Sequence, residues 1–510
     1  MPNTSQVLPL EVACEGGLLL NIGSKDMPVG AATVLQNYEP DVKGGYRRMS
    51  GFAAFDDNAL TGSGQVLGLV ILGSSVIAAR GANVQHSTGS GWTSITTART
   101  SAGRYNFDTY NWIGTEILIM ASGTAGTNAA ATWDGSTYTL MNGAAGSGAG
   151  TAPTNPTDAV EHKDHIFYLQ GNKVTMSAPF NANDFTPASG AAVFTIPDTG
   201  VKLKSFRDQL YIFCEKSIYK LVGDSTSNIA LIDVADDIGC VSGHTVQEIG
   251  GDLVFLAPDG LRTVSGTAKI DDIDISTLSK QIQDRIKGLN ETTFSFSSAL
   301  VRDKSQYRMW YIAGSVAEGQ AKGIIGVIKQ GEGGFYWEYS DTLGIKPSAA
   351  FSGYLSGVEN VLHAGWDDGI VYKQENDTAG TGFAGSNIIS IFRSPDITMQ
   401  DSGLRKRIKR ITFNIKYEGA MAPSLEIEYD FGTSAVPQPA AYAMSIPSSI
   451  SVYGGGKYGF AVYTLDPTAL DRVWVIGSGF SVAIKIIDTS TNASFTILGF
   501  QIEYVEGGRK

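Results

Sequence analysis

The chain has 510 residues, of which 43% are hydrophobic and 17% charged, and its formal net charge is −12. This length leaves room for about two to four domains, and the negative balance excludes a protein that holds nucleic acid chiefly by neutralising its phosphates. Such a surface would let DNA pass without binding, because like charges repel, although a negative balance more often serves solubility alone. The 61 glycines favour an all-β chain with many tight turns, since glycine adopts positive φ without steric cost.

Residues 1–60 open the chain and show no regular hydrophobic period. Pro40 and the pair Gly44 and Gly45 predict an extended, turning arm in this region. The first residues carry no basic stretch, so we expect no signal peptide. The longest uncharged apolar stretch, 66–79, is too short to span a bilayer. We therefore expect a soluble protein without a membrane segment, made in the cytoplasm.

Residues 61–375 carry a loose repeat of one small β unit: an apolar strand, a turn with glycine or aspartate, and a second strand that often holds an aromatic residue. The clearest copies are 210–221 (LYIFCEKSIYKL), 253–264 (LVFLAPDGLRTV) and 363–373 (HAGWDDGIVYK), and fainter ones begin near Leu67, Glu116, His165 and Tyr307. Their spacing of roughly 43 to 55 residues is typical of the four-stranded blade of a β-propeller. Because one hairpin cannot bury its apolar face alone, the repeat predicts a β-propeller of irregular blades that acts as a scaffold.

Three segments interrupt the blade pattern. Residues 121–131 and 142–154 are rich in Gly, Ala, Ser and Thr, and they predict surface loops. Residues 276–288 (STLSKQIQDRIKG) predict a short helix on the side of the ring, with Ser276 as its N-cap. Leu278, Ile282 and Ile286 would share one face of that helix.

Residues 376–510 have a different pattern. A polar, glycine-containing segment at 375–382 is a plausible linker, and longer strands follow it. We expect these strands at 388–392, 408–417, 425–429, 473–476, 482–487 and 495–504. Several alternate in period two, which predicts a separate C-terminal antiparallel β-sandwich. The expected domains are thus an arm (1–60), a propeller (61–375) and a sandwich (376–510).

The sequence holds no GxSxG, P-loop, HExxH or Rossmann pattern, so we predict no catalytic residue, no cofactor and no metal. His162 and His165 have i, i+3 spacing, but the residues after His165 resemble a strand, which favours a surface turn over a metal site. Cys14, Cys214 and Cys240 are far apart and odd in number. They predict buried free thiols and neither a disulfide framework nor a zinc site.

Two features keep sugar chemistry open as an alternative. Residues 133–138 (WDGSTY) and 366–369 (WDDG) resemble the aspartate-box turns of sialidases but lack the full pattern, and Asp-Gly is also a common hairpin turn. Trp92, Trp112, Trp133, Trp337 and Trp366 flank turns. They could stack on sugars, although tryptophans at such positions more often pack between blades. A pair of catalytic carboxylates cannot be chosen among 50 acidic residues.

A basic run places five cations in six positions: Arg405, Lys406, Arg407, Lys409 and Arg410. One interpretation is an interface for phosphate or for an acidic partner. The other is a solvated strand edge, where lysine and arginine prevent edge-to-edge aggregation. Given the overall negative charge, a functional run would contact an acidic face of a neighbouring subunit and not DNA.

The chain resembles the nozzle, hub or packaged-DNA stabilisation proteins of short-tailed bacteriophages at three places. Residues 37–40 (NYEP) and 45–51 (GYRRMSG) are similar to a segment that precedes the first blade in that family. Residues 213–221 (FCEKSIYKL) are similar to a blade strand, and 256–266 (LAPDGLRTVSG) to a turn. The residues that carry the first and third matches are Asn37, Pro40, Arg47, Arg48, Gly51, Pro258, Asp259, Gly260 and Arg262.

This resemblance implies a virion structural protein and not an enzyme. It implies a homohexameric ring below the portal and adaptor that retains packaged double-stranded DNA, opens at infection and carries tail fibres or spikes. DNA would pass through the lumen without sequence-specific binding. The alternatives are a glycan-binding propeller module of a tail tip and a sialidase-like glycosidase.

Overall fold

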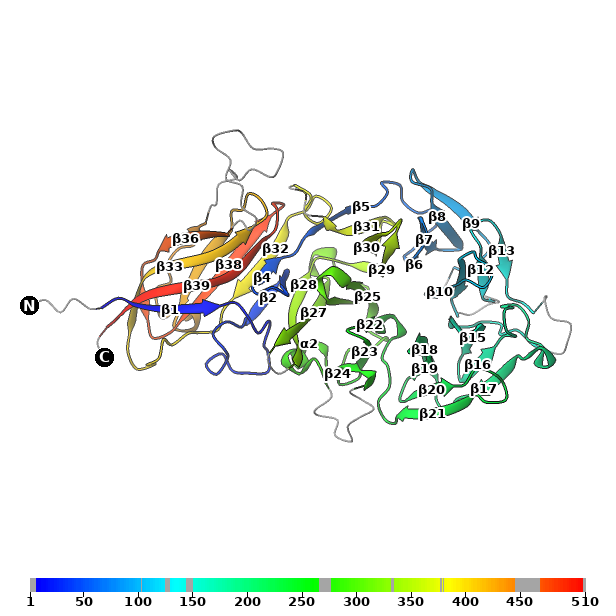
Figure 1. Cartoon of the computed structure of the whole chain (residues 1–510). Coiled ribbons are helices and arrows are strands. Elements are labelled where there is room, and N and C mark those ends of the chain that lie inside the picture. The colour runs from blue at the N-terminus through cyan, green and yellow to red at the C-terminus, as the bar shows by residue number, and fades with distance from the viewer. Residues whose placement is uncertain are drawn as a thin grey trace, which may run out of the picture.

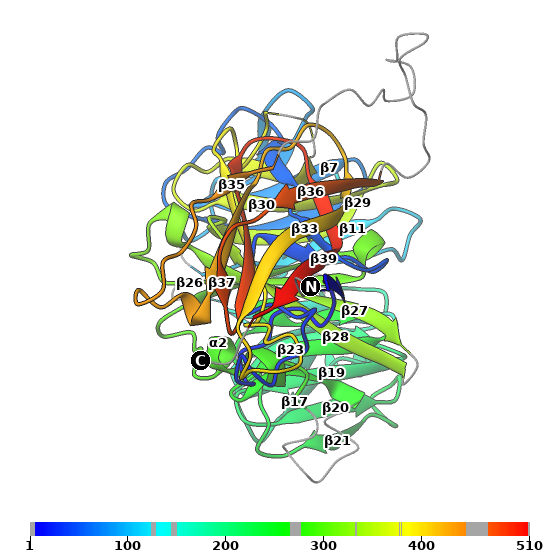
Figure 2. The same cartoon turned by 90° about the vertical axis from the view of Figure 1, so that its left-hand side faces the viewer.

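The computed structural model describes residues 6–101, 103–123, 129–143, 150–265, 277–331, 334–376, 378, 380–444 and 468–507. Figure 1 shows two bodies side by side, a ring of small sheets and a two-sheet sandwich. Figure 2 views the sandwich end-on, with the ring behind it. The all-β class and the propeller that the sequence predicts are confirmed.

Six blades of the ring are separate antiparallel sheets. Four of them use consecutive strands: β6–β9 (Val66–Leu72, Ser75–Arg80, Asn83–Ser87, Trp92–Thr96), β10–β13 (Asn106–Tyr110, Ile117–Ala121, Ala131–Trp133, Tyr138–Leu140), β14–β17 (Asp158–His162, His165–Gln170, Lys173–Met176, Ala192–Thr195) and β18–β21 (Gly200–Phe206, Gln209–Cys214, Ile218–Val222, Ala230–Ala235). The other two are β22–β24 (Gln247–Ile249, Asp252–Ala257, Gly260–Thr263) and β29–β31 (Pro347–Leu355, Val358–Gly365, Val371–Asn376) with β5 (Gly51–Ala54). The ring position between these two is filled by β25–β28 (Ser295–Val301, Gln306–Ile312, Lys322–Gly331, Gly334–Leu343), which continue into a larger sheet.

The predicted repeat units fall on these blades. The three clearest copies are the hairpins β19–β20, β23–β24 and β30–β31, with Leu210 opposite Leu221, and Leu256 opposite Leu261. Their apolar side chains cannot be buried within one sheet, so they pack between neighbouring sheets. For example, Phe213 of one blade lies 5.3 Å from Phe255 of the next, ring centroid to centroid. This packing between blades is the core of the ring.

The sandwich consists of two sheets. One continues from β28 through β2 (Val34–Gln36), β32 (Ile388–Arg393), β38 (Val482–Ser490), β34 (Ser424–Tyr429) and β35 (Tyr442–Ala443). The other holds β3 (Tyr38–Pro40), β4 (Tyr46–Arg48), β39 (Phe495–Glu506), β33 (Lys406–Tyr417), β36 (Thr468–Trp474), β1 (Leu8–Ala13) and β37 (Ser478–Gly479). Period-two alternation turns Ile411, Phe413 and Ile415 inward, where they meet the facing sheet in the largest core cluster.

The segment 1–60, for which the sequence predicts an extended arm, contributes five strands. β1 pairs with β39, β2 with both β28 and β32, and β4 with β39. β5 then pairs with β31 and becomes the fourth strand of that blade, as Figure 1 shows. A short strand gains stability by pairing across a sheet, so this segment links the sandwich to the ring and closes the ring.

The helical segments in the described part of the chain are short. They are η1 (Pro187–Ser189), η2 (Gly243–Thr245), η3 (Lys280–Ile282), α2 (Gln283–Ile286), η4 (Arg302–Lys304), η5 (Glu318–Gln320) and η6 (Asp430–Gly432). The predicted helix within 276–288 corresponds to η3 and α2, where Ile282 and Ile286 are buried. Its expected cap, Ser276, lies outside the described residues, as do residues 144–149 of the predicted loop at 142–154 and the middle of the loop at 121–131.

Candidate functional site

Asn37 ties the ring to the sandwich. Its side-chain nitrogen donates to the carbonyls of Leu343 on β28 and Ile389 on β32, each at 2.9 Å, and its oxygen accepts from the Leu343 amide at 2.8 Å. The backbone of Asn37 has φ of 52°, a conformation that asparagine adopts more readily than most residues. This explains an asparagine at the first position of the motif.

A buried ionic cluster lies next to it. We call Glu39, Arg47, Lys304, Arg308 and Glu375 the Glu39 cluster. One oxygen of Glu39 is 2.9 Å from Arg47 Nη1 and 2.5 Å from Lys304 Nζ, and the other is 2.9 Å from Arg308 Nη2. Glu375 lies 2.5 Å from Lys304 and 2.6 Å from Arg308. The cluster therefore joins the N-terminal segment to two blades, through η4, β26 and β31.

The charges of the cluster compensate one another. Burial alone would raise the pKa of Glu39, but Lys304, Arg308 and Arg47 outweigh it and hold that pKa below its ordinary value of 4.5. The pKa of Glu375 is lowered in the same way, with Arg308 and Lys304 overcoming burial. Both carboxylates are thus ionised at neutral pH, and the cluster acts as a structural clasp between the two bodies. Pro40, which follows Glu39, ends β3 and is buried.

Arg48 and Gly51 complete the first motif. The Arg48 guanidinium is buried and donates to the carbonyls of Ser490 (2.6 Å) and Asn492 (2.9 Å), with Asp488 at 3.4 Å. Gly51 begins β5, and a Cβ on it would lie 2.1 Å from the carbonyl oxygen of Gly382. No larger residue fits there without a shift of the backbone.

The third motif is the β23–β24 turn. Arg262 is fully buried and lies 2.5 Å from Asp259, which also accepts a hydrogen bond from the Thr277 hydroxyl at 3.0 Å. Gly260 has φ of 144°, and a Cβ there would lie 2.6 Å from Ser279 Oγ. This turn, preceded by Pro258, therefore holds the helical segment η3–α2 against the blade formed by β22–β24.

The cations of the basic run on β33 differ in their burial and in their partners. Lys406 is fully buried because it shares the inward parity of Ile408, and its ammonium donates to the carbonyls of Thr398 (2.6 Å) and Asp401. Arg410 pairs with Glu503. Since β33 lies between β39 and β36, the predicted strand edge is not found here.

The remaining cations of the run face outward. Arg405 bonds to Ser478 at 3.0 Å, Arg407 is exposed and Lys409 is half-exposed at a bulge in the β33–β39 ladder. Arg410 also faces the ring of Trp474 on β36, with its guanidinium carbon 5.4 Å from the ring centroid. The run therefore presents part of its charge on the outer face of the sandwich.

An apolar strip that the sequence analysis missed lies beside these cations. Leu470, Trp474 and Ile476 are 61%, 70% and 71% exposed. β36 is the last strand of its sheet within the described residues, with β33 on its other side. Alternation along the strand places Leu470 and Trp474 on the same face as the charged Arg472 and opposite to Val473. This alternation is the sequence signal from which their exposure could have been predicted.

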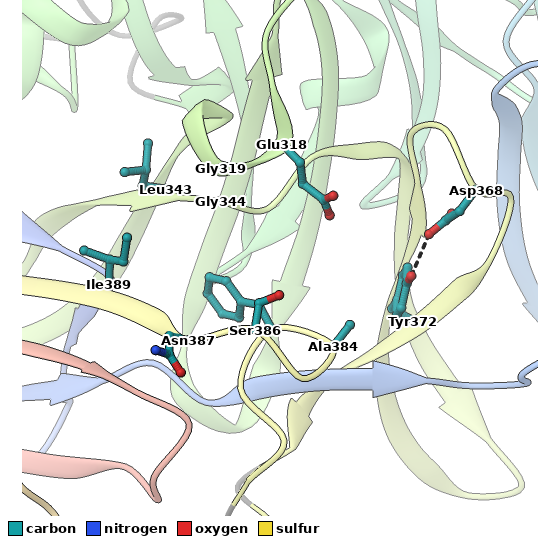
Figure 3. Close-up of a pocket in the computed structure, with 11 residues that line it drawn as sticks. Glu318, Gly319, Leu343, Gly344, Asp368, Tyr372, Ala384, Ser386, Asn387 and Ile389 are labelled. Atoms are coloured by element: carbon teal, nitrogen blue, oxygen red, sulfur yellow. Dashed lines mark hydrogen bonds between the residues drawn. The ribbon is translucent and has the colours of Figure 1, made fainter.

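A pocket of ≈370 Å³ lies where the last blade meets the segment leading to β32. Figure 3 shows Glu318, Asp368 and Tyr372 on one side of it, with the Tyr372 hydroxyl donating to Asp368 at 2.6 Å. Burial and the nearby Asp368 raise the pKa of Glu318. Burial and the hydrogen bond to Asp368 raise the pKa of Tyr372. These groups can accept hydrogen bonds from hydroxylated ligands.

The sequence predicts a surface turn for His162 and His165, and this prediction is wrong. They face each other at the ends of β14 and β15, and both are buried. His162 Nδ1 lies 2.8 Å from Ser205 Oγ, and His165 Nδ1 lies 2.6 Å from the carbonyl oxygen of Ser177. The hydroxyl and carbonyl groups thus supply one polar partner to each buried imidazole, while the Nε2 of His162 is buried without one.

The cysteines and tryptophans that the sequence analysis singled out lie in the interior of the protein or in its apolar clusters. The three cysteines are buried free thiols, as predicted. The five tryptophans named above belong to apolar clusters between blades or under the sandwich, which is the packing interpretation. The part of the chain that the structure describes contains no group of three or more His, Cys, Asp or Glu placed to hold a metal ion. It also contains no helix long and apolar enough to cross a membrane.

Comparisons with known proteins give distant similarities only. No family model and no curated protein matches the chain. Among solved structures, it is similar to the extracellular domain of a hybrid two-component system of B. thetaiotaomicron (13% identity, TM-score 0.33, 70% of this chain and 52% of that one). An ancestral GH74 enzyme gives 10% identity and a TM-score of 0.37 over 65% of this chain and 49% of that one. The computationally designed Ika8 protein gives 9% identity and a TM-score of 0.32 over 63% of this chain and 99% of that one. The chain spans about half the length of the first two, and none of the three carries an argument about function.

Proposed function

We propose that this protein is a structural component of a short-tailed phage tail, which forms a ring at the distal end of the portal and adaptor channel. The resemblance of its three motifs to that family supports the proposal. In this chain, the first motif builds the clasp between propeller and sandwich, and the third anchors the helical segment to its blade. A protein that transmits force along a tail needs two domains that move as one body, and a buried ionic clasp serves that purpose.

The single observation that carries the proposal is a pair of complementary exposed edges. The first is the strip Leu470, Trp474 and Ile476 on and after β36, next to the outward cations Arg407 and Arg472. Exposed apolar edge strands are rare on monomers, because they invite pairing with another chain. The strip therefore favours a protein partner.

The second edge is β21, the outermost strand of its blade. Leu231 and Ile232 are 36% and 41% exposed there, and the next residues are acidic: Asp233, Asp236 and Asp237 are exposed too. One edge is thus apolar and basic, and the other is apolar and acidic. Figure 1 places β36 on the sandwich and β21 on the outer rim of the propeller, at the bottom of the view.

Contact between two different surfaces of the same chain is heterologous, and it produces a closed ring when the rotation between neighbours closes. We infer that β36 of one subunit contacts β21 of the next. The acidic partner expected for the basic run would then be a second copy of this chain. The subunit number of six, the packaged DNA in the lumen and the docking of fibres or spikes come from the family resemblance.

Two measurements test this function. Native mass spectrometry of the purified chain should show one closed oligomer, and immunogold labelling of particles from the source lysate should place gold at one vertex, on a short tail. A chain that stays monomeric at all concentrations, together with unlabelled particles and free antigen, would contradict the proposal.

Glycan binding at the pocket of Figure 3 is a second candidate, because Glu318, Asp368 and Tyr372 converge there. Calorimetric titration with host polysaccharide and turnover of a fluorogenic sugar, each repeated with Glu318→Gln, would test it. Binding or turnover that Glu318→Gln abolishes would favour this candidate. No heat and no turnover would remove it.

A further inference from the structure

A small pocket of ≈150 Å³ lies in the middle of the propeller, where the inner strands of the blades converge. Its lining comes from β6, β10 and the residues just before it, β18, η2, β22, β25 and β29. Propeller axes are natural binding sites, because each inner strand points polar groups at the same space. The side chains that matter here are Arg104, Lys202, Lys204, His244 and Gln247.

Arg104 brings a positive charge without a matching carboxylate. Its guanidinium donates to the carbonyl of Phe296 and to the hydroxyls of Ser297 (3.2 Å) and Ser295 (3.5 Å), all neutral groups on β25 or at its start. No Asp or Glu among the described residues lies within 4.0 Å of it. Its Nε is shielded from solvent and has no hydrogen-bond partner.

The two lysines of β18 differ in whether a carboxylate pairs with their ammonium group. Lys202 donates to Asp158 at 3.1 Å and to Asn106 at 2.8 Å, so its charge is matched. Lys204 makes no hydrogen bond and no salt bridge within the described part of the chain. Asp158 is fully engaged, because its other oxygen accepts from the Leu203 amide at 2.7 Å.

The acidic groups nearby act on these cations only from a distance. Burial raises the pKa of Asp108 to about 6, so its carboxylate is mostly ionised at neutral pH and attracts Lys204 and Lys202, but it accepts its hydrogen bond from the Glu161 amide at 2.9 Å. Glu291 likewise opposes the effect of burial on the pKa of Arg104 without forming a salt bridge with it. Burial lowers the pKa of Arg104 to about 10, which still leaves it charged at neutral pH. Burial, Arg104 and Lys202 lower the pKa of His244 well below its ordinary value, so its imidazole is neutral and can donate or accept a hydrogen bond.

An uncompensated cation in a desolvated place is costly unless a ligand supplies the opposite charge. We propose that the axial pocket binds a small tetrahedral oxyanion of the phosphate class, held by Arg104 and Lys204 with a hydrogen bond from His244. The Gln247 amide nitrogen lines the pocket but already donates to Ser298 Oγ at 3.0 Å. Arginine and lysine are the usual partners of phosphate oxygens. A pocket of this size accepts a free ion or the terminal group of an ester and is too small for a DNA strand. This site does not depend on ring assembly. Its positive charge contrasts with the net charge of −12 of the whole chain.

The test uses the full chain and sodium phosphate, with sodium chloride at equal ionic strength as the reference. Isothermal calorimetry should show one saturable site per chain, and thermal unfolding should show a Tm that rises with phosphate and not with chloride. Lys204→Met should weaken binding at least tenfold. Lys173→Met, a change of an exposed lysine on β16, should leave binding unchanged.

Arg104→Met gives a second readout that does not depend on Lys204. It should abolish the phosphate-dependent rise in Tm, and the circular dichroism spectrum should show that the variant is folded. Methyl phosphate in place of orthophosphate identifies the source: tighter binding of methyl phosphate assigns the site to esters, and tighter binding of orthophosphate to the free ion. Absence of a saturable effect in the wild type, or an effect that persists in both Lys204→Met and Arg104→Met, overturns the proposal.

Discussion

Arg308 and Glu39 are 269 residues apart in sequence, yet Arg308 Nη2 lies 2.9 Å from Glu39 Oε2 and both side chains are 1% exposed. The first belongs to the propeller strand β26 and the second to the N-terminal strand β3. Their contact is the centre of the Glu39 cluster. It links the chain's beginning to its middle at the point where the ring meets the sandwich.

Replacement of Glu39 by Gln should therefore destabilise the whole protein. The change leaves the buried Arg308 and the part-buried Lys304 with one carboxylate in place of two, and loss of one partner of a buried ionic group costs about 3–5 kcal/mol. Urea unfolding followed by circular dichroism would measure the change in the free energy of unfolding. Glu503→Gln is the matched control: it removes the partner of Arg410 at a part-exposed site, where the cost should be about 1 kcal/mol or less. Equal losses in both variants would contradict the special role of the cluster.

The same cluster predicts how stability depends on pH. The pKa values of Glu39 and Glu375 are lowered in the folded state, so the folded chain binds fewer protons there than the unfolded chain. Their contribution is present above the ordinary pKa of 4.5 and is lost as pH falls toward and through the folded values. Unfolding free energies of wild type and Glu39→Gln, measured from pH 7 to pH 3, should converge as pH falls. A gap that widens in acid would show that the carboxylate does not supply this stability.

Much of the fold is readable from the sequence because blade hairpins are local. Leu210 and Leu221 pair within one hairpin, and the same alternation that reveals them also sets their register. The strands of the sandwich are predicted for the same reason. Pairings of distant segments are not readable: Leu8 pairs with Tyr504, and only the assembled sandwich determines that match.

The candidate sites show the same difference between local features, which the sequence reveals, and long-range contacts, which it does not. The motif residues Asn37 and Arg47 stand out in the sequence, but their partners in blades and sandwich do not. Lys406 belongs to a conspicuous basic run, yet strand parity buries it, and parity requires the exact start of β33. Arg104 and Lys204 have no local signal at all, since the ring alone brings their strands to one axis.

Ring closure depends on close contact between two backbones. A Cβ on Gly51 would lie 2.1 Å from the Gly382 oxygen, which also accepts the Phe52 amide, so neither backbone can move freely. Gly51→Ala should lower the free energy of unfolding by about 1–3 kcal/mol, the usual cost of overpacking. Thermal and urea unfolding would measure it. Gly23→Ala, where nothing lies within 4 Å of the added Cβ, should change stability by less than about 0.5 kcal/mol.

The complementary edges predict the behaviour of assembly variants. Trp474→Ser removes the largest exposed apolar group of the β36 edge, and Asp233→Lys reverses a charge on the β21 edge. Each should shift the oligomer to monomers in native mass spectrometry, with an increase in the dissociation constant of at least tenfold, because central aromatic residues dominate most interfaces. Neither change touches a buried group, so the unfolding curve of the monomer should stay within about 0.5 kcal/mol of wild type.

Phe335→Ser is the matched control, since Phe335 is also an exposed aromatic residue, at 78%, but lies on propeller strand β28. It should assemble normally. A stronger version combines charge reversals. Arg407→Asp on β33, beside the β36 strip, should weaken assembly by itself, and assembly should partly recover when it is joined to Asp233→Lys, because the two charges then attract again. Recovery would place these residues opposite each other between subunits. Oligomers that form equally well with Trp474→Ser, Asp233→Lys and Phe335→Ser would show that the ring, if present, uses other surfaces.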